Sequence, residues 1–106
     1  MEMHQVRYFL AVARVLNFTR AAEECNVTQP SLTRAVQKLE EELGGQLFRR
    51  ERALTHLTDL GRQMLPLLER TYEAAQAAKA LAKGIGKAEV ARLRIGIAAV
   101  IDTDAI

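Results

Sequence analysis

Apolar residues recur at helical spacing through the first part of the chain. In the first segment they fall three or four positions apart, and we expect a helix over residues 3–16. Its apolar face consists of Val6, Phe9, Leu10, Ala13 and Leu16. A second, shorter helix is expected over residues 20–25, with Thr19 as its N-cap. The chain thus begins with two short helices separated by a break.

A third segment has the clearest amphipathic pattern. Its apolar residues stand four, three and four positions apart and predict a helix over residues 29–43. They are Leu32, Val36, Leu39 and Leu43. Thr28 can cap this helix by accepting a hydrogen bond from a backbone N–H. Pro30 is tolerated in the first turn, where N–H groups have no partner inside the helix.

The solvent face of this third helix begins with groups that can bind DNA. At about 100° per residue, the face opposite the apolar stripe holds amide, hydroxyl and cationic side chains. It consists of Pro30, Arg34, Gln37 and Glu41, flanked by Thr33 and Lys38. Amides pair with adenine edges, and guanidinium groups pair with guanine or phosphate. We therefore expect a helix-turn-helix unit over about residues 18–37 that enters the major groove with its second helix.

Two short apolar pieces, residues 46–48 and 53–57, follow the third helix. Between them lie Arg49, Arg50 and Arg52, offset only by Glu51. Two short strands joined by a basic loop after a recognition helix are typical of the wing of a winged helix. Residues 1–58 are therefore predicted to form a mainly α, winged helix-turn-helix domain.

A longer helix is expected over residues 59–83, with Thr58 as its cap. Its apolar positions repeat at steps of four and three residues, which is typical of a seam between helices. They are Leu60, Met64, Leu67, Thr71, Ala74, Ala78 and Leu81. Roughly 26 residues at about 1.5 Å each give nearly 40 Å, more than a small winged fold can cover. We expect this linker helix to pair with a second copy of the chain and to bend at Pro66.

The rest of the chain predicts a hinge and then a strand. Gly84-Ile85-Gly86 is expected to stop the long helix, so that residues 84–91 form the hinge. Residues 92–106 read as the first strand of a truncated second domain. A lone strand has nothing to pair with, which suggests the front end of a longer protein.

Composition and charge add little to this pattern. Of the 106 residues 49% are apolar, but only three Phe and two Tyr are aromatic, which suits a core of aliphatic side chains in packed helices. The formal net charge of +2 is a weak indication of a nucleic-acid partner.

The sequence offers no constellation for catalysis or for a cofactor. His4 and His56 are isolated, and there is no Ser/His/Asp set, metal-ligand spacing or Gly-rich phosphate loop. Cys25 is the only cysteine, which excludes an intramolecular disulfide, and we expect it to be a small buried side chain. No segment has the length of an apolar membrane span, and the N-terminus lacks a signal-peptide pattern. We expect a cytoplasmic protein that is not an enzyme and has no cofactor or membrane partner.

Five motifs, in order and at family spacing, resemble those of the LysR-type transcriptional regulators. They are FLAVA at 9–13, NFTRAA at 17–22, VTQPSLT at 27–33, LEEELG at 39–44 and QLF at 46–48. Leu57-Thr58, Gly61 and Leu65-Pro66 continue the pattern. The likeness is close over about residues 3–83 and looser at residues 94–96, which look like the first strand of the family's effector-binding domain.

The resemblance implies a bacterial regulator that binds a two-fold symmetric operator in double-stranded DNA as a dimer or higher oligomer such as a tetramer. Linker helices would pair antiparallel, and a small-molecule effector would act through the domain missing here. The implied base-reading positions are Gln29, Pro30 and Thr33, with Ser31 and Arg34 near the phosphates and Arg50 in the wing. Thr19, Thr28, Lys38 and Arg52 complete the candidate DNA-binding set. The family often has Arg where this chain has Ala53, and we expect the neighbouring Arg52 to take over that contact.

One competing hypothesis is a winged helix that serves as a protein-interaction module, because a fold does not fix a function. The basic wing and the unobstructed N-terminus of the third helix favour DNA. Steep salt dependence of duplex binding would separate the two hypotheses, because it arises only when phosphates are neutralised.

Overall fold

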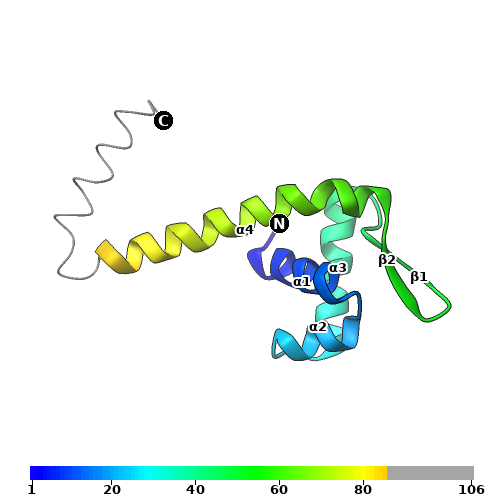
Figure 1. Ribbon diagram of the computed structural model, residues 1–106. Coiled ribbons are helices and arrows are strands. Elements are labelled where there is room, and N and C mark those ends of the chain that lie inside the picture. Colours follow the sequence, from blue (N-terminus) through cyan, green and yellow to red (C-terminus); the bar gives the residue numbers. More distant parts are fainter. Residues whose placement is uncertain (86–106) are drawn as a thin grey trace. The chain divides into compact units, whose positions relative to one another are not determined.

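The computed structural model describes residues 1–85, which form a winged helix-turn-helix followed by a long helix, as predicted (Figure 1). The elements in chain order are α1 (Met3–Val15), α2 (Phe18–Glu24), α3 (Gln29–Leu43), β1 (Phe48–Glu51), β2 (Leu54–Leu57) and α4 (Asp59–Ile85). Most of the predicted hinge, from residue 86 on, and the predicted strand at 92–106 lie outside the described residues.

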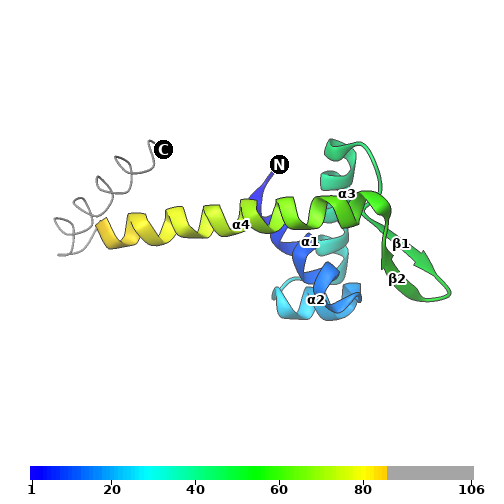
Figure 2. The ribbon, with the colours of Figure 1, turned by 45° about the horizontal axis from the view of Figure 1, so that its top comes forward.

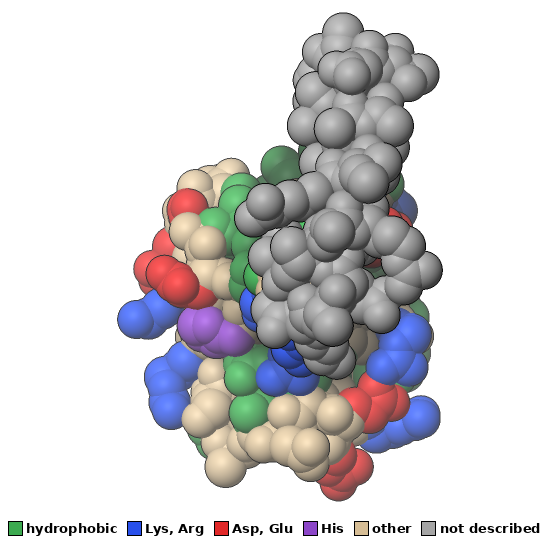
Figure 3. Space-filling view, turned by 90° about the vertical axis from the view of Figure 1, so that its left-hand side faces the viewer, with side chains coloured by type: hydrophobic (Ala, Val, Ile, Leu, Met, Phe, Trp, Pro, Cys, Tyr) green, Lys and Arg blue, Asp and Glu red, His purple; other side chains and the backbone are tan. Residues whose placement is uncertain are grey.

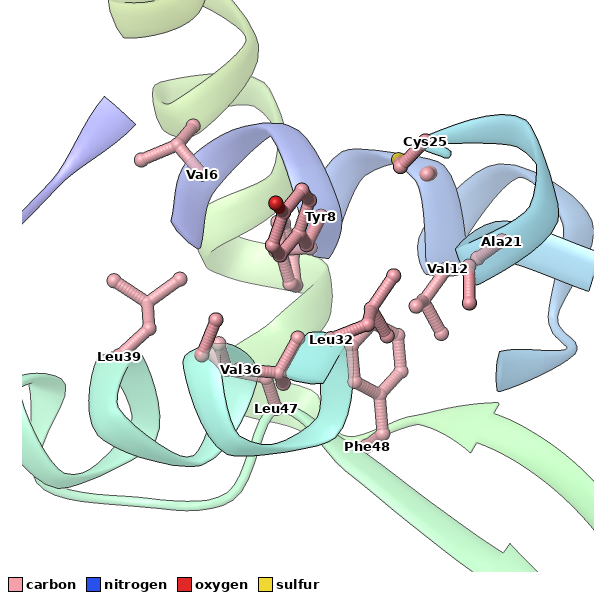
Figure 4. Packing of buried hydrophobic residues seen from close by; sticks show 14 of the residues in the cluster. Val6, Tyr8, Val12, Ala21, Cys25, Leu32, Val36, Leu39, Leu47 and Phe48 are labelled. Carbon is pink, nitrogen blue, oxygen red and sulfur yellow. The ribbon is translucent and has the colours of Figure 1, made fainter. Parts of the chain in front are cut away.

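The core lies between the first three helices and the start of β1. Phe9, Leu32 and Leu39 are among its fully buried side chains, and Leu47 and Phe48 close it from the side of the wing. Figure 4 shows Val6, Tyr8 and Val12 of α1 facing Leu32, Val36 and Leu39 of α3 across this core. Cys25 is buried at the end of α2, as predicted. The core therefore fixes α3 from behind and leaves its polar face free.

The ends of α1 and α2 differ slightly from the prediction. α1 ends at Val15, and Leu16 is a left-handed C-cap (φ 53°) with a side chain that is 44% exposed, rather than part of the apolar face. Thr19 was the predicted N-cap of α2, and this was wrong. Asn17 is the cap, since its side chain accepts from the backbone N–H of Arg20 at 2.8 Å. α2 starts earlier because Phe18 joins the helix and packs against the core.

The wing is a two-stranded antiparallel hairpin with a tighter turn than predicted. β1 pairs with β2 from Phe48↔Leu57 to Glu51↔Leu54. Arg49 and Arg50 therefore lie within β1, not in a loop between the strands. The loop is only Arg52 and Ala53, and both have positive φ (51° and 67°). Figures 1 and 2 show this hairpin extending away from the helices.

The long helix α4 is anchored at its start by backbone contacts. Thr58 N–H donates to the Leu47 carbonyl at 3.0 Å, and the Thr58 hydroxyl donates to the Gln46 carbonyl at 2.6 Å. The same hydroxyl accepts from the N–H of Gly61 at 3.0 Å, so Thr58 caps α4, as predicted. These bonds join the α3–β1 loop to the first turn of α4.

The first part of α4 also packs against the domain. Leu68 is 3% exposed and belongs to the core, and Leu60, Met64, Leu65 and Tyr72 pack on it. The first compact unit of the chain extends from Met1 to Glu73. A winged domain that ends at residue 58 stays a prediction. α4 runs through Pro66, and Gly84, the expected start of the hinge, still belongs to the helix. The bend at Pro66 stays a prediction.

Candidate nucleic-acid interface

The N-terminus of α3 is held by the predicted cap. The Thr28 hydroxyl oxygen accepts from the backbone N–H of Ser31 at 3.2 Å, and Thr28 has extended backbone (φ −75°, ψ 153°). Its hydroxyl donates in turn to the Ser31 hydroxyl at 2.9 Å. Pro30 stands in the first turn, where it sacrifices no intrahelical bond. The start of α3 is thus rigid and exposed, which suits contact with a groove.

Removing this cap is expected to destabilise the domain. Thr28→Ala should lower the free energy of unfolding by about 1 kcal/mol, and the melting temperature by roughly 4–8 °C. Thr19→Ala is the matched control, because Thr19 is equally exposed near the start of a helix but caps nothing. Its expected effect is within about 0.5 kcal/mol. Equal melting temperatures for the two variants would show that the Thr28 bond contributes no stability.

Gln29, Thr33 and Gln37 form a row along one flank of α3, four residues apart. The Gln29 side-chain Nε2 donates to the Thr33 hydroxyl at 2.7 Å. This bond fixes the amide of Gln29 and leaves its carbonyl oxygen and second N–H free. Those two groups match the donor and acceptor that adenine presents in the major groove. The row can therefore read bases, with Thr33 bracing Gln29.

A second row, Pro30, Arg34 and Lys38, lies about 100° further round α3 and is exposed. Within residues 1–85, no carboxylate lies at ion-pair distance from either cation. Their charges are therefore available to a polyanion.

The two arginines of β1 lie on different sides of the wing. Side chains alternate along a strand, so Arg50 shares a side with the buried Phe48, and Arg49 shares the other with Glu51. Arg49 Nε lies 3.8 Å from Glu51 Oε1, an exposed ion pair. The Arg50 guanidinium instead lies 4.3 Å from the centre of the Phe18 ring. Arg52 stands at the tip of the hairpin.

A groove of about 460 Å³ lies between α3 and β1 and brings several predicted residues together. Its lining includes Phe18, Gln29, Thr33, Gln37 and Arg50. Thr19 lines an adjoining hollow with Gln29 and Arg50. The structure does not place Ser31, Arg34, Lys38 and Arg52 in this lining. Arg50 lines the groove on the side of the wing. Arg34 and Lys38 lie outside it, on the neighbouring exposed face of α3.

Two residues that support this arrangement were not found from the sequence. Phe18 stands in the NFTRAA motif with no predicted role of its own, yet its ring touches Arg50. Glu40 stands in the LEEELG motif with no predicted role of its own, yet its carboxylate accepts from the backbone N–H groups of Leu47 (2.8 Å) and Phe48 (3.4 Å). Glu40 therefore ties the last part of α3 to the start of the wing.

The charges on the opposite side of the molecule are mixed. Figure 3 views the side away from the wing, and its visible Lys, Arg, Asp and Glu side chains lie next to one another without a single-sign patch. Elsewhere in residues 1–85, Arg14 pairs with Glu24, and Arg62 pairs with Asp59 in the first turn of α4. Among residues 1–85, there is no group of three His, Cys, Asp or Glu side chains that could hold a metal ion, and no helix is long and apolar enough to cross a membrane.

Comparison with known families decides the class of this protein. The family described as "Bacterial regulatory helix-turn-helix protein, lysR family" matches residues 3–62, which is more than half of the chain. The chain belongs to the LysR family.

Relatives of this LysR-family chain are transcriptional regulators. It is 37% identical over 102 residues to the HTH-type transcriptional regulator IlvR of Caulobacter vibrioides, covering 96% of this chain and 34% of that protein. It is 39% identical over 99 residues to the probable cat1 operon transcriptional activator of Acinetobacter lwoffii, covering 93% and 33%. The chain therefore spans about a third of the length of these curated relatives.

Solved structures of LysR-family proteins share the fold and include DNA complexes. The CbnR DNA-binding domain in complex with DNA is 34% identical, with a TM-score of 0.74, and the match covers 82% of this chain and 100% of that one. The BenM DNA-binding domain in complex with catB site 1 DNA is also 34% identical, with a TM-score of 0.73 and coverage of 81% and 92%. Full-length OxyR from Pseudomonas aeruginosa matches with 37% identity and a TM-score of 0.74, over 78% of this chain and 28% of that one.

Proposed function

We propose that this chain is the DNA-binding part of a transcriptional regulator that recognises a two-fold symmetric operator. The observation that carries the proposal is the groove beside α3, where a row of base-reading side chains lies between cationic side chains of α3 and of the wing. α3 would enter the major groove N-terminus first, as second helices of helix-turn-helix units do. The DNA complexes of CbnR and BenM, both of matching fold, support this assignment.

Each predicted site residue has a role in this proposal. Gln29, Pro30 and Thr33 face the base edges, and Thr28 and Ser31 fix the helix end beside the backbone. The cations Arg34, Lys38, Arg50 and Arg52 neutralise phosphates or enter the minor groove. Thr19 lies beside Arg50, since both line one hollow, and contacts the same stretch of DNA backbone in this proposal.

We further propose that the regulator is a dimer through α4. Leu60 and Met64 of the predicted seam already pack on the core of their own domain. The part open to a second copy is Leu67, Thr71, Ala74, Ala78 and Leu81, all exposed. A small-molecule effector would act through the part of the protein beyond this chain, where a tetramer interface would also reside. The role is regulatory and not catalytic, and we place the protein in the cytoplasm with its DNA.

The sharpest test of base reading is Gln29→Ala. On an operator selected from a random duplex pool, this variant should lose roughly 1–3 kcal/mol of binding free energy, as for a lost bidentate contact, and far less on random DNA. Competition binding of both duplexes measures the two losses. Gln63→Ala, which changes an exposed amide on α4, should change neither. Equal losses on operator and random DNA would reassign Gln29 to backbone positioning.

The salt dependence of binding tests the proposal as a whole. Neutralising several phosphates releases counterions, so the logarithm of the binding constant should fall linearly and steeply with the logarithm of salt concentration. Flat salt dependence, or no binding to duplex DNA, would overturn the proposal in favour of a protein-interaction module.

A further inference from the structure

A stack of aromatic rings leads from the core to one arginine of the wing. Phe9 is fully buried, and its ring centre lies 5.3 Å from that of Phe48 at the start of β1. Phe48 meets the Phe18 ring edge-on, with centres 5.5 Å apart and planes at 78°. The Arg50 guanidinium carbon lies 4.3 Å from the centre of Phe18. The stack thus ends in a positive charge beside the groove.

This contact is specific to one of the three wing arginines. Strand alternation puts Arg50 on the side of Phe48, whereas Arg49, which also lines the groove, shares the other side with Glu51 and lies near its carboxylate. Arg52 belongs to the two-residue turn beyond the last strand pair. Among the residues that the structure describes, Arg50 is the wing cation whose side chain rests on an aromatic ring.

Stacking on a ring leaves the guanidinium able to bind DNA. A cation held over a ring face is attracted by the ring, and the five N–H donors of a guanidinium leave several free for phosphate oxygens. Arg50 is also exposed. A long side chain normally loses rotamer freedom when it binds, at a cost equivalent to about 2- to 10-fold in affinity. A side chain already held over a ring avoids part of that loss.

We propose that Phe18 is a positioning residue of the DNA interface, which holds Arg50 in its binding orientation before DNA arrives. The inference rests on the proposed function. Phe18 belongs to α2, lines the groove with Gln29 and Thr33, and touches the wing through Phe48 and Arg50. It therefore fixes the position of the Arg50 guanidinium relative to Gln29 and Thr33. An aliphatic residue of similar size has no ring face and cannot fill this role.

The test is a double-mutant cycle in duplex-DNA affinity. Phe18→Leu keeps an apolar side chain but removes the ring face, and it should weaken binding about 3- to 10-fold. In the Arg50→Ala background the same change should cost less than about 2-fold, because the group it positions is gone. Phe18→Tyr restores the ring and should bind within about 2-fold of wild type. Equal losses from Phe18→Leu in both backgrounds, or no rescue by tyrosine, would overturn the proposal.

The salt slope separates positioning from a general structural effect. Arg50→Ala should reduce the slope by about one phosphate contact, whereas Phe18→Leu should leave it unchanged, because the guanidinium still reaches the DNA. A slope reduced by Phe18→Leu as much as by Arg50→Ala would contradict the inference. Circular dichroism checks each fold, and Phe18→Met replaces Phe18→Leu if leucine is not tolerated.

The same measurements keep this inference distinct from the proposed function. Wild-type protein that binds duplex DNA without a salt slope would defeat the proposed function itself. A second outcome would defeat only the role of Phe18. In it, wild-type binding has a steep salt slope and Arg50→Ala weakens it, but Phe18→Leu costs the same affinity with and without Arg50.

Discussion

Ala78→Glu is expected to convert the protein from a dimer to a monomer. Ala78 is exposed on a helix of 27 residues, in line with Leu67, Thr71, Ala74 and Leu81. Leu67 and Leu81 are 49% and 39% exposed, large fractions for leucine side chains. In a two-fold dimer each patch meets its own copy, so one inserted charge per chain places two close together. Light scattering at micromolar concentration should report monomers.

The monomer should also bind an operator far more weakly. Two linked half-site contacts help one another through their effective concentration, a gain of about 100-fold or more that the monomer loses. Ala80→Glu is the matched control: it inserts the same charge into an exposed alanine of the same helix, but about 200° round from Ala78. A dimeric Ala78→Glu variant would move the interface elsewhere, and a monomeric wild type would remove the dimer proposal.

Gly61→Ala is expected to destabilise the domain severely, although alanine is the better helix former. A Cβ at position 61 would lie inside van der Waals contact of the Leu47 carbonyl oxygen and 2.8 Å from Leu57 Cδ2. That carbonyl accepts from the Thr58 N–H, so it cannot move without breaking the bond that starts α4. Helix propensity would favour alanine by about 1 kcal/mol, but overpacking against backbone should cost about 3 kcal/mol or more. Thermal or urea unfolding measures the difference.

Two other glycines make this prediction specific. A Cβ at Gly45 would meet only the Leu60 Cδ2 atom at 2.9 Å, the end of a side chain that can rotate, so Gly45→Ala should cost much less. Gly44 has open space around it but a φ of +84°, so its substitution costs only the left-handed strain, about 1 kcal/mol. If Gly61→Ala unfolds no more easily than Gly45→Ala, the contact between α4 and Leu47 is looser than described.

The sequence predicted the helices well where the pattern is strong. The apolar steps from Leu32 to Leu43 and the cap at Thr28 gave both ends of α3. The N-cap of α2 was wrong because Asn17 and Thr19 are both good caps two residues apart. What decides between them is the packing of Phe18 on the core, a tertiary effect.

The wing strands were misplaced because the turn lacks its usual residues. A two-residue hairpin loop with positive φ at both positions normally contains Asn or Gly. Here Arg52 and Ala53 adopt that backbone, so the sequence carries no turn signal. The arginines then looked like loop residues, although two of them are in β1.

The long helix shows what periodicity leaves open. Its apolar positions form two adjacent stripes, and the pattern alone does not say which chain covers each. Leu68 and Tyr72 pack on their own domain, while Leu67 and Ala78 remain exposed. At the candidate site, the pattern of α3 identified Gln29 and Thr33. The supports Phe18 and Glu40 depend on contacts between elements that no local pattern encodes.

The backbone of Leu47 has a consequence for building hybrid regulators. Its N–H is bound by Glu40 of α3, its carbonyl is bound by Thr58, and Gly61 of α4 lies directly against it. The α4 contacts with the core continue as far as Tyr72. If the winged helix-turn-helix of one regulator were joined to another regulator at the start of α4, it would therefore lose the contacts that its own α4 makes with Leu47 and the core. A hybrid that keeps these contacts has to be joined after Glu73, where the first compact unit ends.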